Sequence, residues 1–214
     1  MMMVRLVGFL CLVLAVGGPP DGKKVVPVDE SRRDPMLRAF RDQVADAARR
    51  EDLSRLRPLI SDGAYFGESS EGLTPDAFVA RIGNLDATER PAFWRQLRDA
   101  LALGMAYDRS GVDPRLIAPY TSALLENPES VAITGARVAV HERADARSPI
   151  VMRLNYDVVA YGPEGTTDEW VQIETADGRV GWVAARYARS PSQPRFEFGN
   201  IHGDWKLIGY GTGD

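Results

Sequence analysis

The spacing of apolar residues changes partway along the chain. Up to about residue 130, apolar residues recur three and four positions apart, which is the period of an amphipathic helix. From Val131 onward they alternate with polar residues, which is the period of a strand. The pattern therefore predicts an α+β protein, with a helical region at 34–130 followed by β structure.

Two helices are marked most clearly in the first region. One begins at Asp34-Pro35, where an N-cap acid precedes a proline at the first helical position. The longest opens at Thr88, and the large aromatic Trp94 on its apolar side is expected in the core. The segment SDGAYFGESSEG at 61–72 is expected to be a loop, because it is rich in Gly, Ser and acidic residues.

The clearest pair of strands flanks the Asp177-Gly178 dipeptide, which predicts a tight hairpin turn. Because side chains alternate along a strand, Val171 and Ile173 share one face, which we assign to the core. Trp170 then lies on the opposite face. The expected strands are 137–142, 157–161, 169–175 and 179–184, with a C-terminal β-hairpin in 191–214.

The first residues are typical of an export signal. An apolar run at 6–16 follows Arg5 and is too short to cross a bilayer of roughly 30 Å as a helix. We predict a signal peptide at 1–17, cleaved after Gly17 or nearby, and a Pro- and Gly-rich linker at 18–33. The protein is then periplasmic or extracellular, with no stable membrane span after cleavage. The alternative is an uncleaved N-terminal anchor.

Charge and residue content narrow the possible chemistry. The net charge is −4, without the basic stripe that a nucleic-acid partner requires. The single cysteine, Cys11, is lost with the signal peptide, and His141 and His202 have neither zinc-ligand spacing nor a nucleophile motif nearby. Acid pairs such as Asp168-Glu169 lie in hydrophilic, turn-like sequence. We therefore expect a protein that is not an enzyme, with no cofactor and no metal.

Motifs in order along residues 135–189 resemble the bacterial SH3-like domains of exported proteins. They are an opening strand at 137–142, Trp-Val-Gln-Ile at 170–173, the Asp-Gly turn, Gly-Trp-Val at 181–183 and a closing aromatic, Tyr187. The first loop departs from the family, because His141–Ala146 replaces its common Arg-x-Gly-Pro run. The resemblance implies a small SH3-like β-barrel at 131–190. The last segment looks like the C-terminal strand of related exported proteins, which implies that 195–214 return to the helical region; the alternative is a separate hairpin.

The resemblance implies a non-catalytic cell-envelope protein that uses an SH3-like module to bind peptidoglycan or an envelope protein. An aromatic patch beside acids can stack on a sugar or a peptide. The alternative role of the two hairpin tryptophans is packing against the helical region or the barrel end. The candidate ligand-binding residues are Trp170, Trp182, Tyr156, Tyr161 and Tyr187.

Two other functions stay open. One is a targeting domain of a cell-wall hydrolase, although residues 34–130 contain neither the cysteine nor the histidine that such catalytic regions use. The other is a purely structural or regulatory partner of an envelope protein.

Overall fold

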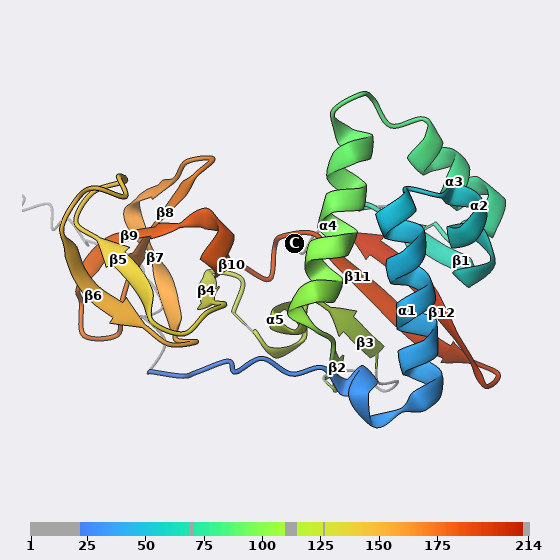
Figure 1. The fold of residues 1–214 in the computed structure, drawn as a ribbon, viewed down its shortest axis with the longest axis horizontal. Helices are drawn as coiled ribbons and strands as arrows, with labels where there is room; N and C mark the ends of the chain where they lie inside the picture. Colours follow the sequence, from blue (N-terminus) through green and yellow to red (C-terminus); the bar gives the residue numbers. More distant parts are fainter. Residues whose placement is uncertain (1–21, 69–70, 110–114, 126, 212–214) are drawn as a thin grey trace, which may run out of the picture.

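The computed structural model describes residues 22–68, 71–109, 115–125 and 127–211, and the predicted signal peptide lies outside them. These residues form two lobes, one of helices on a sheet and one of β strands (Figure 1). The α+β class is thus confirmed. No helix in the described part of the chain is long and apolar enough to cross a membrane.

The first lobe, called the helical lobe, places α1 and α4 over one face of a five-stranded sheet (Figure 1). Its main helices are α1 (Pro35–Arg50), α2 (Leu53–Leu56), α3 (Pro75–Gly83), α4 (Glu89–Leu103) and α5 (Tyr120–Leu124), with 3-10 turns at Glu30–Arg33 and Arg57–Leu59. Its strands, in sheet order, are β1 (Ile60–Phe66), β12 (Asp204–Gly211), β11 (Arg195–Ile201), β3 (Arg115–Ala118) and β2 (Ala106–Asp108).

Side-chain caps explain where the two longest helices begin. The Asp34 carboxylate accepts a hydrogen bond from Met36 N at 2.8 Å, as its position before Pro35 predicts. At α4 the cap is Asp86, whose Oδ1 accepts from the backbone N–H of Thr88 and Glu89 at 2.7 and 2.8 Å. Trp94 lies in the core beneath α4, as its helical spacing predicts.

The C-terminal strands return to the helical lobe. β12 pairs in parallel with β1, and β11 pairs antiparallel with β3. The expectation of a loop at 61–72 was wrong for 61–66, since β1 occupies 60–66. Local composition favours a loop there, but β12 supplies a pairing partner from the other end of the chain.

The second lobe, called the β lobe, is one seven-stranded sheet. In sheet order its strands are β10 (Ala188–Arg189), β4 (Ser130–Ile133), β7 (Val158–Thr166), β8 (Trp170–Glu174), β9 (Val180–Ala184), β5 (Val138–His141) and β6 (Ile150–Leu154), with a 3-10 turn at Ala185–Tyr187. Strands lie close to the four predicted segments, and the Asp-Gly turn joins β8 to β9.

The prediction of an SH3-like barrel at 131–190 was wrong. The sheet is not closed: within the described residues, β6 pairs only with β5 and β10 only with β4. The Trp-Val-Gln-Ile and Gly-Trp-Val motifs indicate two strands and a hairpin, which are local features. Closure depends on pairing between the end strands, which no local motif encodes.

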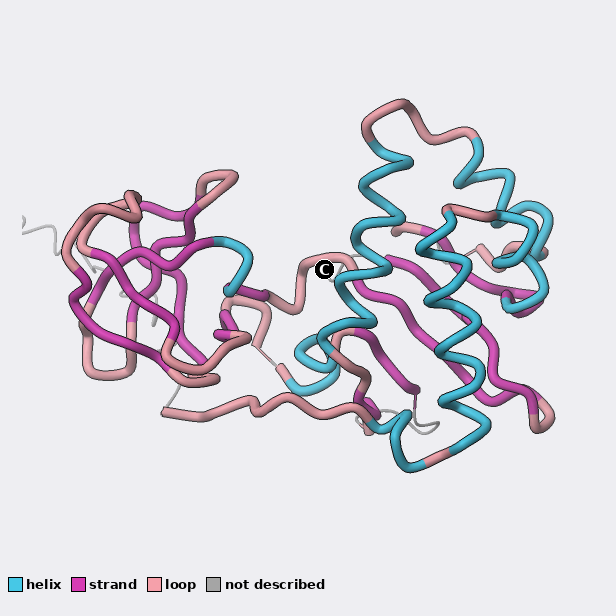
Figure 2. Tube along the Cα trace, viewed as in Figure 1, coloured by secondary structure: helices cyan, strands magenta, loops and turns pink. Residues whose placement is uncertain are grey.

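An extended segment at 23–29, called the strap, runs between the lobes (Figure 2). Val158 N donates to Lys23 O at 2.8 Å and Val25 N to Tyr156 O at 2.9 Å. Its far end meets the helical lobe at Gly104, where a side chain would collide with the Val28 carbonyl oxygen. The strap residue Val25 belongs to a small core shared by both lobes, with Ala106, Tyr120, Leu125, Ala132 and Val158.

Candidate functional site

The five aromatic residues predicted to bind ligand do not form one patch. Trp182 is only 8% exposed, and Trp170 is half-buried with its ring edge against His141, 5.4 Å between centroids. Tyr161 and Tyr187 are each 37% exposed, and Tyr156 lies half-buried beside the strap. No ring contact joins any two of the five within the described chain.

Trp182 is buried although it lies on the face of β9 opposite the core residue Val183. Val171 and Ile173 are in the lobe's core, as their alternation predicts. On the opposite face, Gln172 lies across from Trp182 and is also buried. Its Oε1 accepts from Glu164 N at 2.6 Å, so the end of β7 bends over this face. The face of the hairpin opposite the lobe's core is therefore covered at Gln172 and Trp182.

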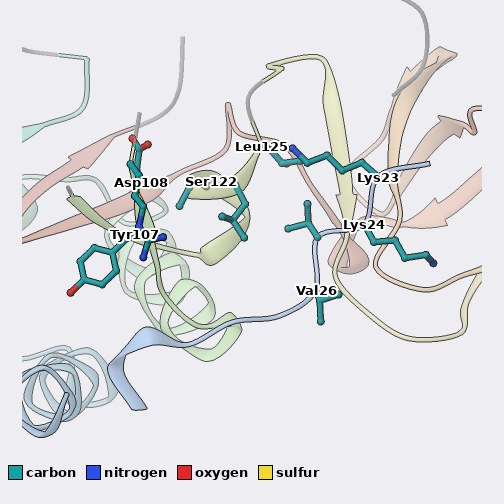
Figure 3. A pocket seen from close by; sticks show the side chains of 11 residues that line it. Lys23, Lys24, Val26, Tyr107, Asp108, Ser122 and Leu125 are labelled. Carbon is teal, nitrogen blue, oxygen red and sulfur yellow. The ribbon is translucent and has the colours of Figure 1, made fainter. Parts of the chain in front are cut away.

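A groove of about 850 Å³ lies between the two lobes (Figure 3). It is formed by the first half of the strap, the edge strand β2 and the short helix α5. Sequence reasoning missed it, because its walls come from segments about eighty to a hundred residues apart. The lining residues are Lys23–Val26, Tyr107–Arg109 and Ser122–Leu125.

The lining combines apolar and cationic side chains. Val26 is 60% exposed on the strap, and Leu125 faces the groove from the end of α5. Lys23 and Lys24 extend in opposite directions from the strap (Figure 3). Lys24 Nζ bonds to Asn155 O and pairs with Asp157, both at 3.0 Å, which anchors the strap to the β lobe.

Polar groups behind the groove wall are buried. Tyr120 is fully buried and its hydroxyl donates to Val25 O at 3.3 Å. Burial, with a smaller contribution from nearby Tyr156, raises the pKa of Tyr120 to about 12. Ser122 Oγ is buried without a hydrogen-bond partner among the described residues. A buried hydroxyl of this kind is usually satisfied by water or a ligand.

The edge of β2 also borders the groove. β2 is the last strand of its sheet, and Met105 O, just before it, accepts from Glu30 N on the strap side. Backbone groups two residues apart in a strand point the same way, so those of Tyr107 also face that side. The groove therefore presents main-chain hydrogen-bonding groups as well as side chains.

A second polar cluster lies on the sheet of the helical lobe, around a carboxylate that is paired with two arginines. The Glu197 carboxylate is buried and accepts from Arg115 at 3.0 Å and from Arg195 at 3.1 Å. Burial, and then the Glu197 carboxylate, raise the pKa of the nearby Tyr65. This arrangement is a structural network. Among the described residues, no three His, Cys, Asp or Glu side chains gather as a metal site would require.

Comparisons with known proteins do not assign the chain to a family. No protein-family model matches it, and no curated protein matches it. The resemblance to SH3-like domains thus has no support from these comparisons, and the open sheet contradicts it. A solved structure of an NTF2-like protein of unknown function from Pseudomonas putida KT2440 aligns over 86% of this chain and 87% of its own. It is 8% identical with a TM-score of 0.27, which is too low to support any conclusion about fold or function.

Proposed function

We propose that this protein is an exported, non-catalytic binding protein of the cell envelope, with the groove between its lobes as the ligand site. The observation that carries the proposal is the groove itself, where strap, β2 and α5 combine apolar lining with cations and a strand edge. The signal-peptide pattern of the first residues supports export.

The groove chemistry suits an extended, carboxylate-bearing ligand. Arg109 lies at the groove with its guanidinium 6.0 Å from the Tyr107 ring centre, where it can meet a carboxylate. The β2 edge can hydrogen-bond to a peptide backbone, and Val26 and Leu125 can contact apolar groups. Peptidoglycan, through its acidic stem peptides, and an envelope protein both have this chemistry.

A substitution at the groove mouth tests the proposal. Val26→Glu adds negative charge and bulk where an apolar group of the acidic ligand would lie, and Val26 is exposed enough for the fold to tolerate it. We expect retention of the protein by purified cell-wall sacculi, or by an immobilised envelope extract, to fall roughly tenfold. A sedimentation assay measures retention by sacculi, and a pull-down assay measures retention by the envelope extract.

Ile201→Glu is the matched control, since Ile201 is an exposed apolar residue at the far end of β11. Equal retention of the parent and both variants would contradict the groove as the site. Clearing of a cell-wall suspension by the parent protein would contradict the non-catalytic part of the proposal.

A further inference from the structure

The strand β6 is an end of the β-lobe sheet, on the side away from the helical lobe (Figure 1). Within the described chain it pairs only with β5. Its first two residues, Ile150 and Val151, are each 46% exposed. Sheet edges are usually blunted by charge, proline or cover, because their free backbone groups can pair with another chain.

An exposed apolar residue also lies on β9, which β5 separates from β6. Val151 packs toward Gly181, where an added Cβ would lie 3.2 Å from Val151 Cγ2. Val180, next to Gly181, is also exposed. Ile150 and Val151 are thus exposed apolar side chains on β6 itself, one on each face of the strand.

The edge is positively charged although the chain as a whole carries −4. Residues 136–154 contain four arginines and two acidic residues, so the formal net charge of this segment is +2 when its histidine is neutral. Glu142 and Arg143 form an ion pair at 3.9 Å. The other three arginines, Arg137, Arg147 and Arg153, form no ion pair within the described residues, and Arg153 Nη1 donates only to the Arg137 carbonyl, at 3.0 Å.

We propose that β6 binds an extended, acidic segment of another protein as an added strand. Backbone hydrogen bonds to the free edge hold the segment, its apolar side chains cover Ile150 and Val151, and its carboxylates pair with Arg147 and Arg153. A second copy of this chain is unsuited to pair with β6 through the same edge, because two edges that each carry a net charge of +2 would repel each other. This site is separate from the groove and does not depend on it.

A short fluorescently labelled peptide of alternating glutamate and valine tests the proposal with the mature chain. We expect saturable binding that weakens as salt is raised, together with slower amide exchange at 150–154. Arg153→Glu should weaken binding roughly tenfold by placing a like charge beside the segment. Arg95→Glu is the matched control, since Arg95 is an exposed residue of α4 with no ion pair among the described residues.

Two further peptides separate strand addition from simple charge attraction. A lysine–valine peptide should not bind, and a glutamate–valine peptide with a central proline should bind much more weakly, because proline cannot donate to the ladder. The proposal is overturned by equal binding of the proline peptide, by unchanged binding to Arg153→Glu, by exchange protection outside 150–154, or by no binding at all. A dimer held through β6 in sedimentation equilibrium would also overturn it.

Discussion

Tyr120 is the residue at which the strap, the helical lobe and the shared core meet. Its pKa is raised from about 10 to about 12 by burial, so folding favours the neutral phenol. The resulting stability is complete below about pH 10 and is lost as pH rises through 12. We expect Tyr120→Phe to lose less stability than the parent between pH 9 and pH 12, measured by urea unfolding at intervals of pH. Identical pH dependence in the two proteins would contradict this assignment.

The five aromatic residues predicted to bind ligand differ in burial. Their substitutions should therefore differ in their effect on the free energy of unfolding. Trp182→Ala removes a buried ring on β9, the strand between β8 and β5, and should cost about 3–5 kcal/mol of unfolding free energy. Tyr161→Ala removes an exposed ring and should change it by less than about 0.5 kcal/mol. Chemical denaturation of both variants measures the difference, and comparable losses would contradict the burial of Trp182.

At the scale of elements, α4 depends on a cap that lies before its first turn. Backbone N–H groups of Glu89 and Thr88 hydrogen-bond to Asp86 and lower the pKa of its carboxyl. The stability that this cap contributes is present above the pKa of Asp86 in the unfolded protein, about 4. It is lost as the pH falls through the lower pKa of Asp86 in the folded protein. We expect Asp86→Ala to lower the thermal midpoint at pH 7, and Asp86→Asn, which keeps an acceptor oxygen, to lower it less. A larger loss in Asp86→Asn would contradict the capping role.

At the scale of the whole molecule, the strap joins the two lobes through one buried side chain. Val25 is 3% exposed in the shared core, whereas its neighbour Val26 is 60% exposed. We expect Val25→Ala to cost about 1.5–3 kcal/mol and Val26→Ala less than about 0.5 kcal/mol, measured by urea unfolding. Limited proteolysis should cut the Val25→Ala variant sooner in the segments joining the lobes. Equal stability of the two variants would contradict a joining role for the strap.

The residue pattern predicted some elements well because their causes are local. The Asp34-Pro35 start of α1, the periodicity of α4 and the Asp-Gly hairpin each depend on a few neighbouring residues. β1 was missed, because its sequence favours a loop and its strand depends on pairing with β12 about 140 positions away. Whether Trp182 is buried was left open, because its neighbours across the sheet, His141 and Gln172, lie on other strands.

The sequence by itself determined the α+β class, the starts of α1 and α4, four of the seven strands of the β lobe and which face of β8 enters its core. Only the tertiary structure decided that the strands form an open sheet with a free β6 edge, that Trp182 is buried and that a groove opens between the lobes. The physical reason is the separation along the chain over which each interaction acts. Caps, periodicity and turns act over a few residues, whereas sheet closure, burial of a second face and the groove depend on which distant segments meet.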